Sequence, residues 1–268
     1  MNRYNLSNRL EKVANLVEPA AFLVDIGCDH GFLAIDLVKS VKVKKALCTD
    51  INEGPLKRAG DHIKEYGLED IIDTCLSDGL TALKNDYEKY DFDTCTICGM
   101  GGLMGVKIIF EADEFFRRMN CFYLQLQSDL ELVRIFLKKS GYEILFEDMV
   151  FEDSKYYTVL KVKNKGITDT DASGFGGISF DDLPYKLKDI YDSLDENESV
   201  KYKYPYYEGM DRETYEQFLL FMTDKYAKIY SFLPKDSDRI PIIKKERRIM
   251  ELALGLYKEK NNVIKRDL

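Results

Sequence analysis

The stretch FLVDIGCDHG, residues 22–31, decides the fold class of this 268-residue chain. Its first five residues are mainly apolar and predict a buried strand, and the glycines at 27 and 31 predict a tight turn into a following helix. Glycines at such a turn let the backbone approach a ligand, and the amides of a helix N-terminus face an anionic group. The stretch therefore predicts the first unit of a ligand-binding α/β fold. The alternative is a tight turn that ends a buried strand without any ligand.

The turn differs from the G-x-G-x-x-G pattern of dinucleotide-binding proteins, because Asp29 stands in place of the second glycine. A carboxylate there would repel a pyrophosphate, whereas it would attract the amino and sulfonium groups of S-adenosylmethionine. Asp25, Gly27, Cys28 and Asp29 are therefore candidate cofactor-binding residues.

Outward from this stretch, short apolar runs alternate with helix-length periodic segments, a pattern typical of a parallel sheet covered by helices. Only four residues separate the last two predicted strands, so a hairpin must join them. The sequence predicts an α/β fold with a doubly wound, seven-stranded, Rossmann-like sheet that ends in an antiparallel hairpin. This arrangement resembles the methyltransferase sheet found in most S-adenosylmethionine-dependent methyltransferases. The predicted strands cover residues 22–26, 44–49, 71–76, 92–98, 121–126, 143–151 and 156–163, and the predicted helices cover 7–17, 31–40, 53–66, 101–118 and 128–139.

The composition changes at residues 165–179, KGITDTDASGFGGIS, which are polar, carry four glycines and lack periodicity. We place a domain boundary there, with residues 1–165 as the methyltransferase domain and 166–268 as a helical C-terminal domain. In 211–233 apolar side chains recur at steps of three and four, and the proline-containing stretch 234–241 suits a turn. This pattern predicts a coiled-coil-like helical hairpin.

Two further strand ends carry an acid. Asp50, followed by Ile51, ends the second strand 25 residues after Asp25, where a doubly wound fold places the carboxylate that binds ribose hydroxyls. Asp78, followed by Gly79, ends the third strand, where an acid can accept from an adenine amino group. Each acid alone is equally well explained as a turn former, but acids at three successive strand ends favour a nucleoside ligand.

The fourth strand leads into Cys98-Gly-Met-Gly-Gly102, a turn whose glycines cost backbone entropy unless something must come close. In this fold the turn faces the substrate. We expect cofactor contacts from Cys98 and Gly99 and substrate contacts from Met100, Gly101 and Gly102. Cys95 and Cys98 form a C-x-x-C pair, but the chain has no second pair and only two histidines, so we expect no metal site. Of those histidines, His62 is expected to be a solvated surface residue.

Five short motifs lie in order between residues 7 and 163. They are Asp-Ile-Gly-x-Asp-His at 25–30, Asn-Glu-Gly-Pro at 52–55, Asp-Gly-Leu at 78–80, Gly-Met-Gly-Gly at 99–102 and Glu-Asp…Tyr-Tyr at 147–157. Together they resemble the TrmK family of bacterial tRNA (adenine-22-N1)-methyltransferases. The chain departs from common family residues at Ala34, at Cys98 and at Gln125-Leu-Gln127, where a Gln-Pro-Asn run is common. Beyond residue 165 only the architecture agrees, since the family also appends a helical domain.

The resemblance implies transfer of a methyl group from S-adenosylmethionine to N1 of an adenine in the tRNA D-arm. It places Asp25, Gly27 and Asp29 at the methionine end of the cofactor, Asp50 at the ribose and Asp78 at the adenine. Adenine N1 attacks through a free lone pair, so the reaction needs alignment and a group that stabilises the positive charge developing on the base. We expect Asp29 to fill that catalytic role, with His30 orienting it or touching the substrate.

Adenine N1 lies on the Watson–Crick edge, so the base must be exposed before it reacts. An aromatic side chain is then expected to stack on it, and Tyr156 or Tyr157 is the candidate. Packing within the hairpin is the alternative for both tyrosines.

The chain is acidic, with a formal net charge of −8, but its charge is unevenly distributed. Residues 165–200 hold nine acids and three bases, whereas residues 240–266 hold eight bases and three acids. Lys244, Lys245, Arg247 and Arg248 are therefore candidate tRNA contacts, together with Arg3, Arg9 and Lys12. The alternative is a solvated coiled-coil face.

No apolar run approaches the roughly 20 residues needed to cross a bilayer, so we expect a cytoplasmic protein with no membrane partner. The oligomeric state is left open, with a monomer preferred. Two alternative functions stay open. One is a methyltransferase of the same fold that acts on a small molecule or a protein, and the other is a non-catalytic RNA-binding protein that retains a cofactor pocket.

Overall fold

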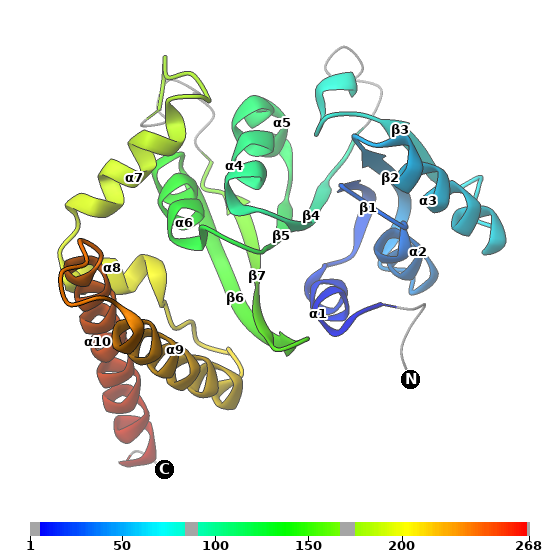
Figure 1. Ribbon diagram of the computed structural model, residues 1–268. Coiled ribbons are helices and arrows are strands. Elements are labelled where there is room, and N and C mark those ends of the chain that lie inside the picture. Colours follow the sequence, from blue (N-terminus) through cyan, green and yellow to red (C-terminus); the bar gives the residue numbers. More distant parts are fainter. Residues whose placement is uncertain (1–5, 84–90, 167–174, 267–268) are drawn as a thin grey trace.

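The computed structural model describes residues 6–83, 91–166 and 175–266, with side chains as far as residue 260. Within these ranges seven strands form one sheet in the order β3-β2-β1-β4-β5-β7-β6 (Figure 1). The first five strands pair in parallel, and β7 runs antiparallel to both β5 and β6. The predicted doubly wound sheet with a terminal hairpin is therefore confirmed.

The predicted elements of the sheet region agree with the structure to within two residues, apart from the helix expected over 101–118. That segment forms two helices, because the backbone of Ala112 leaves the helical region (φ −123°, ψ 28°). The strands are β1 (Ala20–Ile26), β2 (Val43–Asp50), β3 (Ile72–Leu76), β4 (Thr94–Met100), β5 (Cys121–Leu126), β6 (Tyr142–Glu152) and β7 (Lys155–Asn164). The helices are α1 (Asn8–Leu16), α2 (Phe32–Lys39), α3 (Glu53–Glu65), the 3-10 turn η2 (Thr81–Leu83), α4 (Gly102–Glu111), α5 (Asp113–Arg118), α6 (Leu130–Lys139), α7 (Leu183–Ser193), α8 (Glu196–Lys203), α9 (Arg212–Phe232) and α10 (Ile240–Arg266).

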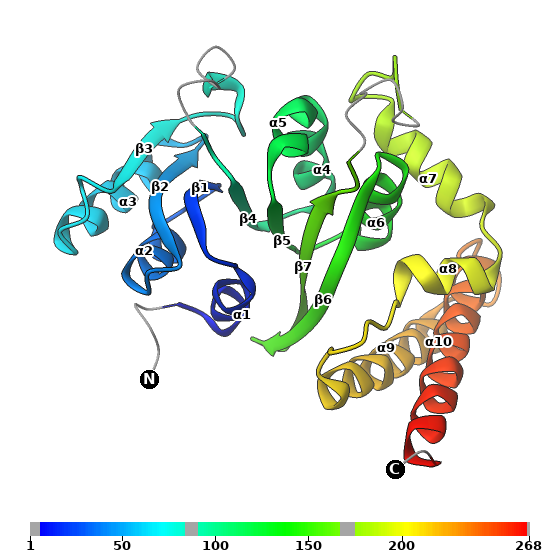
Figure 2. The same cartoon turned by 180° about the vertical axis from the view of Figure 1, so that it is seen from behind.

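Helices cover both faces of the sheet (Figures 1 and 2). α1, α2 and α3 pack their apolar side chains on one face, and α4, α5, α6 and α7 pack theirs on the other. Leu183 and Leu187 of α7 are fully buried in the same core as α4 and α6, although α7 follows the predicted domain boundary. The central part of that boundary, residues 167–174, lies outside the described residues, so the division into two domains stays a prediction.

The remaining helices, α8, α9 and α10, share a smaller core with β6 of the terminal hairpin. Met149 of β6 packs there with Leu219 of α9 and Ile249 of α10. The long helices begin where local chemistry favours it: the side chain of Asp211 accepts from the amide of Thr214 at 2.7 Å and caps α9. The predicted helical hairpin of α9 and α10 therefore forms and rests on the edge strand of the sheet.

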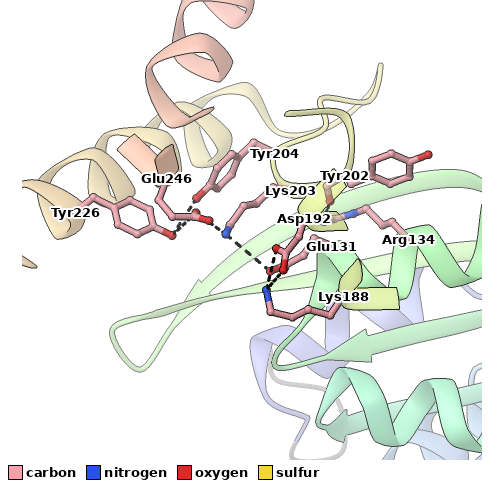
Figure 3. Close-up of polar contacts among 9 residues, drawn as sticks. All are labelled: Glu131, Arg134, Lys188, Asp192, Tyr202, Lys203, Tyr204, Tyr226 and Glu246. Carbon is pink, nitrogen blue, oxygen red and sulfur yellow. Dashed lines mark hydrogen bonds and ion pairs between the residues drawn. The ribbon is translucent and has the colours of Figure 1, made fainter. Parts of the chain in front are cut away.

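A buried ion pair ties this helical part to the sheet. Glu147 of β6 accepts from Arg134 of α6 through Nε at 3.0 Å and Nη2 at 2.5 Å, and neither side chain is more than 3% exposed. The remaining guanidinium nitrogen, Nη1, donates to the carbonyl oxygen of Tyr202 in α8 at 2.6 Å (Figure 3). We call these three residues the helical seam.

Beside the helical seam, Lys203 of α8 forms the centre of a second polar cluster (Figure 3). Its Nζ lies 2.5 Å from Glu246 Oε2 of α10 and 3.8 Å from Glu131 Oε1 of α6. The hydroxyl of Tyr226 in α9 donates to the same Glu246 oxygen at 3.1 Å. These contacts join the helices of both parts. Burial lowers the pKa of Lys203, but the surrounding acids and tyrosine hydroxyls together raise it above its ordinary value.

Candidate active site

A cleft of about 320 Å³ opens where β1, β2 and β4 end. The carboxyl ends of parallel strands are where open α/β sheets bind ligands. Seven of the ten predicted cofactor residues line this cleft, and so do both predicted catalytic residues. The lining consists of Arg9, Leu10, Asp25, Gly27, Cys28, Asp29, His30, Phe32, Leu33, Asp50, Asn52, Pro55, Cys98 and Gly99.

Asp25 is the most deeply buried acid of the cleft, with 2% of its surface exposed. Its Oδ1 accepts a hydrogen bond from the hydroxyl of Thr96 at 2.6 Å. Burial raises the pKa of Asp25 to about 6, the bond from Thr96 opposes that rise, and the neighbouring Asp50 adds to it. A carboxylate that burial destabilises in this way is stabilised when a cationic group binds beside it.

Asp50 and Asp29 join the loops that follow β1 and β2. Asp50 accepts from the amide of Asn52 at 2.9 Å through Oδ1 and from the amide of Asp29 at 3.4 Å through Oδ2. Asp29 has a left-handed backbone (φ 50°), and its side chain is 68% exposed. Its Oδ1 lies 3.6 Å from Arg58 Nη2 and 3.7 Å from His30 Nε2. The Asp29 carboxylate therefore sits at the open side of the cleft, while Asp25 sits at its base.

Two positions show why glycine follows the strands here. A side chain at Gly27, which has φ 71°, would place its Cβ 2.8 Å from Cε of Met100. At Gly102 a Cβ would lie 2.1 Å from the carbonyl oxygen of Ser128. The glycine at 102 is thus required by the chain's own packing, in addition to any role beside a substrate.

His30 stacks in a short aromatic row with Phe32 and His62. The ring centroids of Phe32 and His62 are 4.4 Å apart, and His62 Nδ1 lies 3.0 Å from the carbonyl oxygen of His30. The expectation that His62 is a solvated surface residue was wrong, because its ring packs against the cofactor loop. His30 Nδ1 is buried and has no hydrogen-bond partner within the described residues.

Three predicted cofactor residues do not line the cleft. Ile51 is 61% exposed, and Asp78 lies beside Lys107, with Oδ2 and Nζ 3.4 Å apart. Gly79 faces Ile108, whose Cγ1 would be 3.2 Å from an added Cβ. Their roles at the cofactor stay predictions.

The predicted substrate residues are divided between two places. Met100, Gly101 and Gly102 continue from the cleft residue Gly99, and the Tyr157 ring centroid lies 5.7 Å from the Arg9 guanidinium. Tyr156 packs instead against Phe218 and Phe221 of α9. Four basic candidates lie on α10: Lys244, Lys245, Arg247 and Arg248.

Some of those bases already have partners. Arg248 Nε lies 2.5 Å from Glu196 Oε1, and Arg247 Nη2 lies 3.6 Å from Glu251 Oε1.

Within the described ranges no three His, Cys, Asp or Glu side chains gather as metal ligands. In the same part of the chain, no helix combines the length and the apolar character needed to cross a membrane.

Sequence reasoning did not place Arg9 and Leu10 in the cleft. Both come from α1, a helix that precedes the first strand and carries no ligand-binding motif. A basic residue in the first turn of an amphipathic helix is ordinary, so the sequence holds no local signal for this position.

The fold and the acidic cleft at its strand ends define a Rossmann-like methyltransferase. Residues 6–160 match the model of a family described as a methyltransferase domain, and the chain belongs to that family.

A comparison with curated proteins identifies a more specific family within the methyltransferases. The tRNA (adenine(22)-N(1))-methyltransferase of Bacillus subtilis (strain 168) is 33% identical over 179 residues, which cover 67% of this chain and 72% of the relative. The chain therefore belongs to the tRNA (adenine(22)-N(1))-methyltransferase family, TrmK.

Two solved structures share the fold over nearly the whole chain. M. capricolum TrmK in complex with S-adenosyl-homocysteine has a TM-score of 0.71 at 23% identity, covering 94% of this chain and 99% of that one. Streptococcus pneumoniae Sp1610, described as a putative tRNA (m1A22) methyltransferase in complex with S-adenosyl-L-methionine, has a TM-score of 0.67 at 23% identity, covering 93% and 99%. The agreement includes the C-terminal helices.

Proposed function

We propose that this protein transfers the methyl group of S-adenosylmethionine to N1 of adenine 22 in tRNA. One structural observation carries the proposal: Asp25, Asp29 and Asp50 converge on a single cleft at the strand ends of a TrmK-family fold. The relatives' activity supports the substrate, and the charge of the cleft supports the cofactor.

The residues of the cleft fit S-adenosylmethionine. Asp50, at the end of β2, would hold the ribose hydroxyls, and Asp25 and Asp29 would face the ammonium and sulfonium groups. Among the described residues, the neutral hydroxyl of Thr96 is the side-chain donor to the buried Asp25 carboxylate, which leaves this carboxylate open to a cationic partner. When bound, the cofactor supplies a methyl group activated by the sulfonium.

The reaction does not require a general base from the protein. Adenine N1 attacks through its lone pair, so no residue has to remove a proton, and positive charge develops on the base. Asp29, exposed at the open side of the cleft, would stabilise that charge, with His30 beside it. The turn from Gly99 to Gly102 would form the slot for the base and hold N1 in line with the methyl group.

We propose residues 166–268 as a helical domain that binds tRNA, with Lys244 and Lys245 as bases that have no acid at ion-pair distance among the described residues. An adenine paired in the folded tRNA must be turned out to react, and Tyr157 is proposed to stack on it. A cytoplasmic monomer that needs no metal ion is the form we propose for the enzyme.

Methylation of unmodified tRNA transcripts tests the function. The purified protein, given labelled S-adenosylmethionine, should methylate a transcript at adenine 22, located by mass spectrometry of nuclease fragments. A transcript with guanine at position 22 should accept no label. Transfer to proteins or small molecules in place of tRNA, or cofactor binding without any transfer, would contradict the proposal.

A further inference from the structure

We propose that a second pocket, between the sheet and the helical part, binds a phosphate group. The pocket has a volume of about 230 Å³ and lies where α6, the start of β6 and α8 meet. Arg134 and Tyr202 of the helical seam form part of its wall, and they lie side by side (Figure 3). The proposed methyl transfer uses none of the residues that line this pocket.

The pocket is separate from the catalytic cleft. Tyr142, which lines the pocket, is the first residue of β6 and pairs with Asn164, the last residue of β7. β7 runs antiparallel to β5, and its Val162 pairs with Phe122 near the start of β5. The pocket therefore lies at the amino end of β5, whereas the cleft lies at the carboxyl ends of the parallel strands. A ligand of the pocket is thus distinct from the cofactor proposed for the cleft.

Bases outnumber acids in the pocket, although the chain as a whole has a formal net charge of −8. The charged residues of the wall are Glu143, Arg134, Lys138, Lys165 and Lys201. Glu147 pairs with Arg134 in the seam, and Glu143 Oε2 lies 3.8 Å from Lys163 Nζ, outside the pocket. In the described ranges no acid lies at ion-pair distance from the three lysines of the wall, which we call the pocket lysines.

The positions of the pocket lysines indicate an anionic ligand. A helix dipole favours a base in the last turn, which accounts for Lys138 in α6 and Lys201 in α8, each taken alone. It does not account for Lys165, which follows β7 and belongs to no helix. The neighbouring Lys203, by contrast, has the acids Glu246 and Glu131 within 4 Å. Three unpaired ammonium groups at one pocket repel one another unless an anion binds between them.

The size and the donors of the pocket fit a phosphate group. Its volume is below the roughly 300–1,000 Å³ usual for drug-sized ligands, so it suits a compact ligand. A phosphate offers several acceptor oxygens to the ammonium groups, and the Lys138 Nζ is held 5.3 Å from the centroid of the Tyr202 ring. Tyr207 adds a hydroxyl to the wall. Burial, and then the nearby Glu147, raise the pKa of Tyr207 to about 12, so this hydroxyl keeps its proton at neutral pH and can donate it to an anion.

A bound phosphate group would fasten the helical part to the sheet. Lys138 and Lys165 belong to the sheet part, whereas Lys201 belongs to α8. The three charges repel one another across this junction, and an anion between them attracts all three. A free phosphate compound and the backbone of tRNA offer the same group, so the experiment compares these two sources.

Titration with inorganic pyrophosphate tests the proposal. Calorimetry at constant ionic strength compares the full-length wild-type protein with the double variant Lys138→Gln, Lys201→Gln. The wild type should bind pyrophosphate at a single site, and the variant should bind it about 10- to 100-fold more weakly, because two charge-assisted contacts are lost. Hydrogen exchange of the α8 amides should slow on binding in the wild type and stay unchanged in the variant.

The double variant Lys244→Gln, Lys245→Gln is the matched control, because it removes the same charge from α10. It should bind pyrophosphate within twofold of the wild type. An equal loss of affinity in both double variants would mean that pyrophosphate responds to net charge alone. Absence of binding to the wild type would mean that the pocket takes no phosphate group, and either result overturns the proposal.

A competition with tRNA identifies the source of the phosphate group. If pyrophosphate displaces tRNA from the wild-type protein and the pocket variant binds tRNA more weakly, the pocket holds a phosphate of the RNA backbone. If pyrophosphate binds at its single site and leaves tRNA binding unchanged, the pocket holds a free phosphate compound.

Discussion

Two buried acids of this protein have opposite surroundings. Glu147 in the helical seam is fully buried and accepts two hydrogen bonds from the guanidinium of Arg134. Asp25 in the cleft is buried to nearly the same extent, yet its side-chain donor is the neutral hydroxyl of Thr96. The seam pairs its charges within the protein, whereas no cation of the described residues lies at ion-pair distance from Asp25. The difference indicates that the buried Glu147 serves folding, whereas the buried Asp25 serves a ligand.

The largest expected effect comes from breaking the seam. Arg134→Met would leave Glu147 buried without its partner, and we expect a loss of about 3–5 kcal/mol in the free energy of unfolding. Urea denaturation followed by circular dichroism measures this loss. The double variant Arg134→Met, Glu147→Leu removes both charges and should recover most of the stability. Equal destabilisation in the single and double variants would show that the pair contributes through its shape alone.

Removing an acid from the cleft should lower the methylation activity and leave the folding stability nearly unchanged. Asp29 is largely exposed, so Asp29→Ala should leave the urea midpoint nearly unchanged. Methyl transfer to tRNA should fall by about 100- to 1,000-fold, the usual loss when one preorganised electrostatic group is removed from an active site. Single-turnover methylation measures the effect, and Asp61→Ala, an exposed acid on α3, is the matched control. Near-normal turnover in Asp29→Ala would remove this residue from the mechanism.

The contrast between the two acids extends to pH. The pKa of Asp25 is raised from an ordinary 3.8 to about 6, so the folded protein binds this proton more tightly than the unfolded chain does. Asp25 therefore makes the folding stability of the protein fall as the pH rises from about 4 to about 6. A cationic ligand needs the ionised form, so S-adenosylmethionine should bind about tenfold more weakly at pH 5 than at pH 7.5. Calorimetry at both pH values measures the ratio, and Asp25→Asn should flatten it.

The sequence alone predicts the strands and the cleft acids better than it predicts the contacts of the helical seam. The strands and the cleft acids were predictable, because apolar runs define the strands and parallel strands end at one edge of the sheet. Asp25 and Asp50 therefore had to come close, whatever the details of packing. Local pattern also predicted the terminal hairpin, through the four residues between its strands.

Contacts between distant elements were not predictable in this way. Arg9 reaches the cleft from α1, whose first amide is held by Glu152 of the hairpin, more than a hundred residues later in the chain. His62 was expected to face water, but its ring on α3 stacks against Phe32 beside the cofactor loop. The pairing of Arg134 with Glu147 likewise depends on how α6 packs across β6, which no short motif encodes.

The smallest expected effect is on tRNA binding, and it compares bases of α10 that have no acidic partner with bases that have one. Arg248 and Arg247 lie beside Glu196 and Glu251, as the charges of the seam lie beside their partners, whereas within the described chain no acid lies at ion-pair distance from Lys244 or Lys245. Phosphate binding should therefore depend more on the two lysines. Lys244→Gln with Lys245→Gln should weaken tRNA binding about fivefold and reduce the slope of log K against log salt by about one to two. Arg247→Gln with Arg248→Gln should change the slope less, because these arginines give up internal partners in order to bind. Filter binding across a salt series measures both slopes, and equal changes in the two double variants would mean that internal pairing does not decide which bases meet the RNA.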